Sequence, residues 1–587
     1  MAVAGSASSN SDLHQPPGAS TECPSQHERK PNIIFILTDD QDLLMSSLEY
    51  MPHTQKHLLK EGTLYQKHFC TTSICCPARV SLLTGRLSHN TNVTDVAPPY
   101  GKYWPNPYDG LSWMRGYPKF ISEGLNDAYL PIWLQQAGYD TYYTGKLFNA
   151  HDVTNYNKPF AKGWTENEFL LDPFTYDYFN PSYQHNQEKP VQSKGQYTTD
   201  IMVEKVNGFV DKAKKSRKPF FMGIAPIAPH SDVQFSTDPN KPPQIIAPLP
   251  AKRHENLFKD AKIPRTPNFN PDKPSGVSWI KERKQLTQEQ VDYLDEFYRQ
   301  RLRSLQSVDE LVDGLVQRLE KENLLDNTYI FYTTDNGFHL AQHRLLAGKE
   351  CGFDEDINIP LIVRGPGVPK NHTTELVTAH VDIAPTFLKL AGAPNRKEFD
   401  GEAIPLSEKE IVKAAETRQE HVTVEYWGFA QIEGKLFEDP SARIPNNTYK
   451  AVRIVSDEYS FYYSVFCHNE RELYDMKTDP YQINNLLAPS SKIKTLLGKP
   501  LKQVVDRLDT LVFVLKSCKA QGCIKPWHTL HPQGNVKSLA DALSPRFDHF
   551  YAAQRRVSLP QCTLGYIQER EGPQFEKEGS IYRMNGV

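Results

Sequence analysis

Short strand-like runs that alternate with helical patterns constrain the fold of this chain more than any other feature of its sequence. The run Pro31 to Thr38 is apolar and lacks the alternation of a half-exposed strand, so it predicts a strand buried on both faces of a parallel sheet. Further strand candidates lie at 139–144, 219–225, 328–334 and 360–364. Helical patterns lie between them, notably over 288–324 and 381–391. This alternation predicts an α/β fold with helices on both faces of the sheet.

The last third of the chain differs in character from the part before it. From about residue 420, β-rich runs at 420–427 and 460–466 are followed by charged helical stretches and a tail that contains proline. Because 587 residues are enough for two or more domains with separate cores, we expect three parts. These are a disordered polar tail over 1–30, a large α/β domain over 31–415 and a smaller C-terminal α+β domain over 416–587. Two aromatic-rich segments, 100–120 and 164–183, are predicted as long insertions that shape a site or pack over the sheet.

Charge and hydropathy argue against two classes of partner. The formal net charge is −3 and the isoelectric point is near 6.7, so the chain lacks the positive surplus of a nucleic-acid-binding protein. No apolar run reaches the roughly 18 residues of a membrane span, so we expect a soluble protein without a membrane partner. The first 30 residues contain no apolar segment of the kind found in signal peptides. As written, the sequence predicts a cytoplasmic location, or a secreted one if a signal peptide was removed.

Two of the predicted strands end in the same way, on acidic and amide side chains. Asp39 and Asp40 follow the first strand in L-T-D-D-Q-D, and Asp335 and Asn336 follow the fourth in Y-T-T-D-N-G. In an open α/β sheet the functional crevice lies at the carboxyl ends of the strands, so these side chains are expected to face one point. Three carboxylates and an amide oxygen suit Ca²⁺ or Mg²⁺ better than zinc or copper. The alternative is that each pair only forms a turn.

The cysteine-rich segment C-T-T-S-I-C-C-P-A-R-V-S-L-L-T-G-R, over 70–86, places a reactive side chain beside an anion site. Pro77 is predicted as the first residue of a short helix that the glycine of L-T-G-R ends. Cys75 and Cys76 then lie at the helix N-terminus, where free backbone N–H groups and the dipole favour an anion. Arg79 follows one turn after Cys75, and its planar guanidinium suits a tetrahedral oxyanion. The alternative is a structural segment in which both cysteines form disulfides.

The motif C-C-P-A-R-V-S-L-L-T-G-R resembles the signature of the type I sulfatases, in which the first cysteine of C-x-P-[SA]-R is oxidised to formylglycine. The two strand-end motifs stand in that family's order, and the similarity extends over about residues 31–490. The ending C-K-A-Q-G-C-I-K-P-W resembles the branch that holds fungal and algal arylsulfatases and N-acetylglucosamine-6-sulfatases. The resemblance implies a large alkaline-phosphatase-like sandwich with a mostly parallel central sheet, and residues 31–415 as the catalytic sulfatase domain.

The resemblance also implies a cofactor and a set of site residues. Cys75 would become formylglycine (3-oxoalanine), with the formylglycine-generating enzyme as the partner in maturation. One Ca²⁺ ion would be bound by Asp39, Asp40, Asp335, Asn336 and residue 75. The implied catalytic residues, beside Cys75, are Arg79, Lys146, His230 and Lys349. One position departs from the family: Phe148 stands where many sulfatases carry a histidine, and His151 is the candidate to replace it.

The implied reaction is hydrolysis of a sulfate ester, in the manner of an arylsulfatase. One hydroxyl of the hydrated aldehyde attacks sulfur with the help of Ca²⁺, and His230 or Lys349 protonates the departing alcohol. The second hydroxyl then expels sulfate from a covalent sulfated-enzyme intermediate. Two alternatives stay open: a phosphate or phosphonate ester hydrolase on the same scaffold, and a non-catalytic Ca²⁺-binding protein with unmodified Cys75. The substrate is a small-molecule or carbohydrate sulfate ester whose alcohol, whether aryl, sugar or alkyl, is not specified.

The number of cysteines indicates whether the protein belongs to a reducing or an oxidising cellular compartment. Nine cysteines are an odd number, so at least one is unpaired within the chain. If Cys75 is converted, eight remain for up to four disulfides, and Cys518 and Cys523 are expected as a local pair. Cys70 is expected to be structural and Cys76 to pack or pair. An even remainder favours a secretory glycoprotein, although three glycosylation sequons are about what chance gives in this length.

Overall fold

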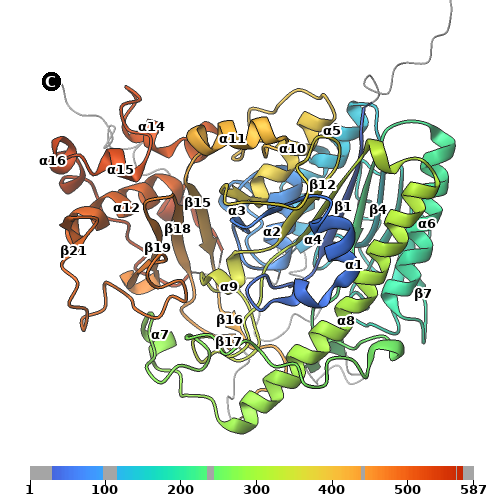
Figure 1. The fold of residues 1–587 in the computed structure, drawn as a ribbon, viewed down its shortest axis with the longest axis horizontal. Coiled ribbons are helices and arrows are strands. Elements are labelled where there is room, and N and C mark those ends of the chain that lie inside the picture. Colours follow the sequence, from blue (N-terminus) through green and yellow to red (C-terminus); the bar gives the residue numbers. More distant parts are fainter. Residues whose placement is uncertain (1–29, 97–115, 235–243, 438–442, 564, 573–587) are drawn as a thin grey trace, which may run out of the picture.

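The computed structural model describes residues 30–96, 116–234, 244–437, 443–563 and 565–572 (Figure 1). The predicted tail over 1–30, except for its last residue, and most of the aromatic segment over 100–120 lie outside these residues. At the centre is a ten-stranded sheet with the order β13-β2-β12-β11-β1-β8-β4-β5-β6-β7. Its strands are β1 (Asn32–Thr38), β2 (Thr63–Tyr65), β4 (Asp140–Lys146), β5 (Glu166–Leu170), β6 (Ser182–His185), β7 (Val191–Gln192), β8 (Phe220–Ala225), β11 (Thr328–Thr334), β12 (Leu361–Arg364) and β13 (His372–Thr374).

The middle of this sheet is parallel. Strands β11, β1, β8, β4 and β5 run in one direction, whereas β12 and β6 pair antiparallel on the two sides. All seven residues of β1 are buried, as expected for a strand covered on both faces. Thr38 of β1 pairs with Thr334 of β11, so these two strands end at the same level. The predicted α/β sheet is therefore confirmed, with antiparallel strands added outside its parallel centre.

Helices cover both faces of the sheet (Figure 1). The main ones are α2 (Cys75–Thr84), α5 (Leu130–Gln136), α6 (Thr198–Ser216), α8 (Gln288–Lys321) and α10 (Ile383–Leu390). On one face, Ile34 and Ile36 of β1 share a core with the apolar sides of α6 and α8. On the other face, Phe35 and Leu37 pack with residues of α2, α5 and α10. Within the described residues, none of the helices is long and apolar enough to cross a membrane.

A second sheet lies beside the first (Figure 1). It is antiparallel, with the order β15 (His421–Tyr426), β18 (Tyr449–Val455), β19 (Ser460–Phe466) and β20 (Arg471–Asp475). Helix α12 (Leu501–Leu515) packs against β18. The β-rich runs predicted at 420–427 and 460–466 are β15 and β19. The sheet begins a few residues after the predicted boundary at 415, but the division of the chain into folding domains stays a prediction.

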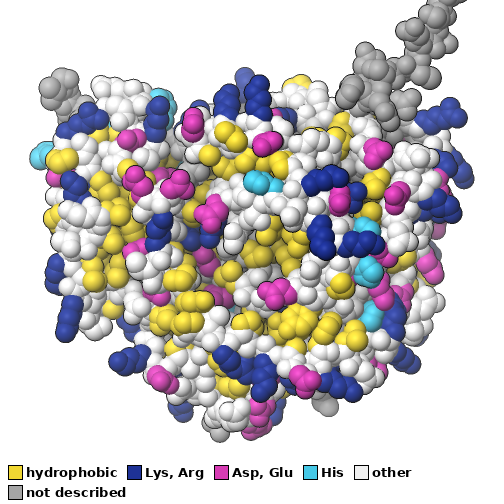
Figure 2. Space-filling model, viewed as in Figure 1, with side chains coloured by type: hydrophobic (Ala, Val, Ile, Leu, Met, Phe, Trp, Pro, Cys, Tyr) yellow, Lys and Arg dark blue, Asp and Glu magenta, His cyan; other side chains and the backbone are white. Residues whose placement is uncertain are grey.

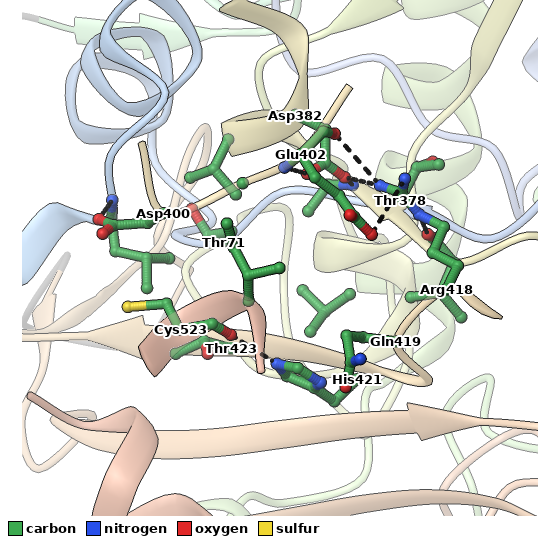
Figure 3. Close-up of a pocket in the computed structure, with 17 residues that line it drawn as sticks. Thr71, Thr378, Asp382, Asp400, Glu402, Arg418, Gln419, His421, Thr423 and Cys523 are labelled. Carbon is green, nitrogen blue, oxygen red and sulfur yellow. Dashed lines mark hydrogen bonds and ion pairs between the residues drawn. The ribbon is translucent and has the colours of Figure 1, made fainter. Parts of the chain in front are cut away.

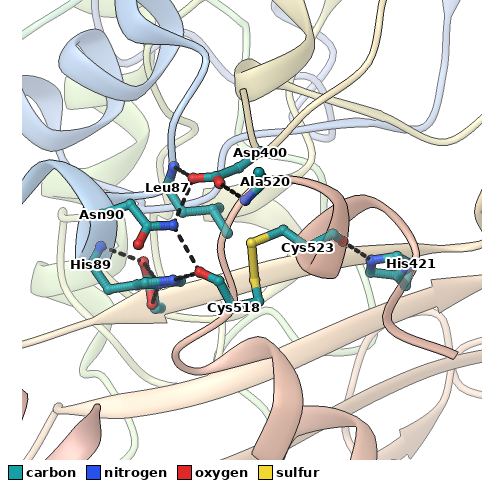
Figure 4. Close-up of a disulfide and its surroundings, with 9 residues drawn as sticks. Leu87, His89, Asn90, Asp400, His421, Cys518, Ala520 and Cys523 are labelled. Carbon is teal, nitrogen blue, oxygen red and sulfur yellow. Dashed lines mark hydrogen bonds and ion pairs between the residues drawn. A yellow bond between two sulfur atoms is a disulfide. The ribbon is translucent and has the colours of Figure 1, made fainter. Parts of the chain in front are cut away.

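Two disulfides lie in this second part of the chain, Cys467–Cys562 and the expected local pair Cys518–Cys523. The carbonyl of Cys518 accepts hydrogen bonds from His89 Nε2 and Asn90 Nδ2, both at 2.8 Å (Figure 4). The disulfide loop is thereby tied to α3 (Ser88–Thr91), just beyond α2. Cys70, Cys75, Cys76 and Cys351 are reduced and buried, and Cys23 lies outside the described residues.

Candidate active site

The two strand-end motifs meet at the carboxyl edge of the sheet. Asp39 and Asp40 leave β1, Asp335 and Asn336 leave β11, and all four side chains are fully buried. The amide of Asn336 donates to Asp40 Oδ1 at 2.7 Å, and the backbone N–H of Asp40 donates to Asp335 Oδ1 at 3.1 Å. The structure thus brings together the four residues that the sequence predicts as ligands, because the register of β1 and β11 ends both strands at one level.

Cys75 joins these carboxylates from the N-terminus of α2. Its Sγ atom lies 3.5 Å from Asp39 Oδ1 and 4.0 Å from Asp40 Oδ1. The helix begins at Cys75 and not at Pro77, so the predicted position of the proline is wrong. A proline is tolerated there because the N–H groups of the whole first turn have no partner within the helix. Burial raises the pKa of the Cys75 thiol well above its usual value, so the unmodified side chain is a neutral thiol.

Arg79 lies one turn along α2 and is fully buried. Its Nε donates to Asp335 Oδ2 at 2.7 Å, and its Nη1 donates to the carbonyl of Lys146 at 2.7 Å. Its Nη2 makes no hydrogen bond and lies 3.5 Å from Asp39 Oδ2. Two of the three guanidinium nitrogens thus fix the side chain by hydrogen bonds, and the third keeps its donor capacity for the oxygen of a ligand.

Two lysines neutralise the paired aspartates. Lys146, at the end of β4, places Nζ 2.6 Å from Asp39 Oδ2, and Lys349 places Nζ 2.5 Å from Asp40 Oδ2. Burial alone would lower the pKa of each lysine, but these carboxylates raise it above the usual value. Both lysines are therefore cations beside Cys75, suited to an anionic group.

His230 approaches Asp40 from the loop after β8. Its Nε2 lies 3.6 Å from Asp40 Oδ2, and its Nδ1 lies 2.7 Å from the carbonyl of Ser231, which accepts the Nδ1 proton. The ring of Tyr176 stacks on the imidazole with 4.1 Å between centroids, and Lys146 Nζ lies 4.8 Å from the centroid of the same tyrosine ring. Tyr176 therefore sets the orientation of two predicted site residues.

His151 is surrounded by aromatic rings and, unlike His230, makes no hydrogen bond through its ring. Its ring lies between Tyr117 and Phe169, with centroid distances of 4.1 and 5.3 Å. Both ring nitrogens are buried without a hydrogen-bond partner, and burial lowers the pKa of His151 to about 3. The described structure therefore gives His151 no hydrogen bond to the strand-end carboxylates, and its replacement of the histidine missing at Phe148 stays a prediction.

The strand-end residues fit a hard divalent cation. Potential ligand atoms of Asp39, Asp40, Cys75 and His230 all lie within 4.8 Å of one another. Asn336 Oδ1 is buried and has no hydrogen-bond partner, because the amide donates its Nδ2 protons to Asp40 and to the carbonyl of Gly337. An orphaned amide oxygen beside buried carboxylates is the donor set that Ca²⁺ prefers. The chemistry of the residues present thus agrees with a Ca²⁺ site.

Sequence reasoning missed Glu433, which follows β16 (Ala430–Gln431) in the second part of the chain. Its Oε1 lies 3.1 Å from Lys349 Nζ, and its Oε2 accepts a hydrogen bond from the Ser231 hydroxyl at 2.5 Å. Burial would raise the pKa of Glu433, but Lys349 and His230 lower it to about 2. Nothing in the local sequence distinguishes this glutamate, whereas Tyr176 lies in the aromatic segment over 164–183 that the sequence does single out.

A separate pocket lies beside the segment that leads into α2 (Figure 3). It is lined by Thr71, by Asp382 and Arg418 from the segments that precede the second sheet, and by His421 at the start of β15. Arg418 donates to Asp382 at 2.6 Å, and His421 Nε2 donates to the carbonyl of Cys523 at 2.9 Å. None of the strand-end residues lines this pocket, so its polar groups belong to the packing between the sheets.

Comparisons with known proteins agree with this geometry. The family model "Sulfatase" matches residues 31–393, and "N-sulphoglucosamine sulphohydrolase, C-terminal" matches residues 342–509. An arylsulfatase of Volvox carteri is 38% identical over 563 residues, which cover 91% of this chain and 82% of the relative. An N-acetylglucosamine-6-sulfatase of Homo sapiens is 31% identical over 528 residues, which cover 85% of this chain and 86% of the relative.

One solved structure, a protein in complex with its substrate D-glucosamine-2-N,6-O-disulfate, is similar with a TM-score of 0.61. The match has 23% identity and covers 79% of this chain and 94% of that one, and it supports the fold alone. The resemblance seen in the sequence is confirmed, including the branch with arylsulfatases and N-acetylglucosamine-6-sulfatases. The chain belongs to the sulfatase family of sulfuric ester hydrolases.

Proposed function

We propose that this chain hydrolyses sulfate monoesters through a formylglycine made from Cys75, with one bound Ca²⁺ ion, and that its activity is of the arylsulfatase type. The observation that supports it most is the place of Cys75, on the first turn of a helix, against Asp39 and Asp40. A neutral buried thiol is a poor nucleophile, whereas a hydrated aldehyde at the same position offers two hydroxyls. The 38% identity to the Volvox arylsulfatase supports the choice of ester.

The cations around Cys75 form the proposed sulfate subsite. Lys146 and Lys349 are held by Asp39 and Asp40, and Arg79 Nη2, which makes no hydrogen bond, faces the same group of carboxylates. These positive charges offset the charge on the oxygens of the transferring sulfuryl group. Because their positions are fixed by buried ion pairs, little reorganisation accompanies the reaction.

The proposed reaction has two steps at residue 75. One hydroxyl of the hydrated aldehyde loses its proton and bonds to sulfur, the S–O bond to the alcohol breaks, and His230 or Lys349 protonates the departing oxygen. The second hydroxyl then loses its proton, the C=O bond re-forms and the C–O bond to sulfate breaks. One water molecule rehydrates the aldehyde in each turnover, so the sum is an ester and water giving an alcohol and sulfate.

Asp39, Asp40, Asp335 and Asn336 would hold the Ca²⁺ ion together with residue 75. When bound, the ion supplies positive charge that lowers the pKa of a hydroxyl at residue 75. The rest of the chemistry rests on the chain itself: Arg79 orients Asp335 through a 2.7 Å hydrogen bond, and Asn336 orients Asp40 through another.

Mass spectrometry of the tryptic peptide that ends at Arg79 tests the modification. Conversion of Cys75 to formylglycine lowers the peptide mass by about 18 Da relative to the reduced cysteine. An intact thiol in protein from a host that carries the formylglycine-generating enzyme, together with undiminished activity, would rule out the mechanism. The control peptide is the one that contains Cys351, which is also buried and reduced and is expected to keep its full mass.

A substrate panel separates sulfate from phosphate chemistry, because the same cations would accept either anion. We expect turnover of aryl sulfates such as 4-nitrophenyl sulfate, and a lower kcat/KM for the matched phosphate and phosphonate esters. N-acetylglucosamine 6-sulfate is the first sugar ester to test, because of the 31% identity to the human N-acetylglucosamine-6-sulfatase. A preference for phosphonate esters would contradict the proposal.

We also propose that the chain matures in an oxidising compartment. Disulfides persist in such compartments and are rare in the cytosol, and two are formed by the described cysteines. Peptide mapping of the protein from its natural source, without reduction, tests this. Reduced Cys518 and Cys523 in that map would contradict the proposal.

A further inference from the structure

Two histidines and an aspartate meet on the face of the sheet opposite α2. His53 is in α1 (Pro52–Thr54), His57 is in the π-helical turn η3 (Gln55–Leu59) that continues it, and Asp313 is in α8. His53 Nδ1 lies 3.3 Å and His57 Nε2 lies 2.6 Å from Asp313 Oδ1. Helices α1 and α8 lie side by side in Figure 1, and Figure 2 shows histidine side chains at the surface over this region.

The spacing of these three side chains fits a tetrahedral metal ion. Their ligand atoms all lie within 4.8 Å of one another. Ligands about 2.0–2.1 Å from a tetrahedral Zn²⁺ ion are separated by about 3.3 Å. The distance between His53 Nδ1 and Asp313 Oδ1 already has this value. A small rotation of the His57 ring would lengthen the distance between His57 Nε2 and Asp313 Oδ1 toward it. Two imidazole nitrogens and one carboxylate favour Zn²⁺ over Ca²⁺, which prefers oxygen ligands.

The surrounding contacts hold the three side chains in place. The amide of Gln317 donates to Asp313 Oδ2 at 2.7 Å, which leaves Oδ1 directed at the histidines. Asp309, one turn earlier in α8, accepts from the backbone N–H groups of His53 and Thr54 at 2.9 and 2.6 Å. Partners of this kind orient metal ligands and raise affinity. The side chain of His53 is 41% exposed, so a water molecule has room to complete the tetrahedron.

We propose that His53, His57 and Asp313 form a Zn²⁺ site that ties the α1–η3 segment to α8. Of the two histidines only His57 makes a hydrogen bond to Asp313, whereas His53 Nδ1 lies in ion-pair contact with the same carboxylate oxygen. The site braces elements next to the catalytic centre, since α1 follows the loop that carries Asp40. Helix α8 carries Arg301, whose guanidinium donates to the carbonyl of Asp40 at 2.5 Å.

Isothermal titration of the full-length protein with ZnCl₂, in buffer saturated with Ca²⁺, tests the site. We expect one Zn²⁺ per chain at this site, bound on the order of tenfold or more weakly by the His53→Ala and Asp313→Asn variants. His528→Ala is the matched control because His528 is an exposed histidine on α14 (Pro526–Leu530), and we expect no change in its Zn²⁺ binding. Co²⁺ should give the intense visible absorption of a tetrahedral ion, and this absorption should be lost in the His53→Ala variant.

Three results would overturn the proposal. They are the absence of Zn²⁺ binding, binding that His53→Ala leaves unchanged, and binding that is lost only in Asp40→Asn, which would put the ion among the strand-end carboxylates. Because His53 is partly exposed and its ring contacts only Asp313 among the described ion pairs, its alanine variant is expected to fold. Circular dichroism checks this, and His57→Gln is the second variant if it does not.

Discussion

Two fully buried groups of charged residues in this protein differ in one respect. The proposed catalytic centre, formed by the strand-end residues with Cys75, Arg79, Lys146 and Lys349, keeps buried polar atoms without hydrogen-bond partners, namely Arg79 Nη2 and Asn336 Oδ1. The second group, which we call the Lys450 cluster, consists of His89, Glu425, Lys450 and Glu571 with the ring of Trp427. Within the described structure, no buried side-chain nitrogen or oxygen of these five residues lacks a hydrogen-bond partner.

In the Lys450 cluster every charge has an opposite charge beside it. Lys450 Nζ lies 3.2 Å from Glu425, 3.1 Å from Glu571 and 3.4 Å from the centroid of the Trp427 ring. Glu425 also pairs with His89 at 2.9 Å. Buried charged groups can therefore serve two purposes. A cluster whose polar atoms all have hydrogen-bond partners joins parts of the fold, whereas a group that keeps polar atoms without such partners can bind a ligand.

The largest effect is expected at the catalytic centre. Cys75→Ala should lower kcat by about 10⁵-fold or more, because the variant lacks the side chain from which the proposed nucleophile is made, with little change in the free energy of unfolding. Cys75→Ser should accumulate sulfated enzyme, because serine has no second hydroxyl to expel the sulfate. Intact mass spectrometry after incubation with an aryl sulfate detects this species. Full activity in either variant would contradict the role of Cys75.

The next effect is expected in the Lys450 cluster, and on stability. Lys450→Met should lower the free energy of unfolding by about 3–5 kcal/mol, because Glu425 and Glu571 would stay buried without their shared cation. Urea denaturation measures the change, and kcat of the folded fraction should be retained. The matched control is Lys162→Met, whose partner Asp127 is exposed, and we expect a loss of less than about 1 kcal/mol there. If Lys450→Met lowered kcat without changing the free energy of unfolding, the Lys450 cluster would act in catalysis and the contrast with the proposed catalytic centre would be wrong.

The fold was largely predictable because its signals are local. The apolar run that becomes β1 and the shared ending of β1 and β11 follow from the chemistry of a few adjacent residues, and strand register brings Asp39 and Asp335 together. The sequence predicts the start of α2 two residues late, because a proline in a first turn does not mark which residue of that turn comes first. Family resemblance added Lys146 and His230, which no local pattern distinguishes.

Glu433 could not be predicted because packing between distant segments places it. Its backbone N–H donates to the carbonyl of Ala347 at 2.8 Å, and Ile432 forms an isolated β-bridge with Gly348. This backbone pairing places the carboxylate of Glu433 next to Lys349. The Lys450 cluster was missed for the same reason: it joins His89, just beyond α2, to residues of the second sheet and to Glu571. Side chains that meet only through tertiary structure leave no periodic or motif signal in one sequence.

Acid should weaken the Lys450 cluster in a defined pH window. Burial would raise the pKa of Glu425, but His89 and Lys450 lower it to about 2, against about 4.3 for an unperturbed glutamate. A carboxyl group whose pKa is lower in the folded than in the unfolded state stabilises the fold at pH values above the unfolded-state pKa. This stabilisation is lost as the pH falls toward the folded-state pKa, and here the loss is on the order of 3 kcal/mol between pH 5 and pH 2. The advantage of the natural chain over Glu425→Gln in urea denaturation should therefore shrink as the pH falls. An advantage independent of pH would mean that Glu425 is not ionised in the fold.

The contribution of His89 to stability changes with pH in the opposite direction to that of Glu425. Burial opposes its protonation, but Glu425 raises the pKa of His89 above the usual value. Its contribution is present below the unfolded pKa of about 6.5 and is lost as the pH rises through the folded pKa. The cluster is therefore expected to stabilise the fold most at mildly acidic pH.

The smallest effect is expected where the second part of the chain reaches the catalytic centre. Glu433→Gln keeps the size of the side chain but removes the charge that holds Lys349 at 3.1 Å and the strong acceptor for the Ser231 hydroxyl. Because Ser231 also positions His230 through its carbonyl, both candidate proton donors lose orientation, and kcat should fall by about 10- to 100-fold. Steady-state kinetics on an aryl sulfate measures this, with Glu398→Gln, on an exposed loop, as the control. An unchanged kcat in Glu433→Gln would mean that Glu433, like the residues of the Lys450 cluster, only joins two parts of the fold.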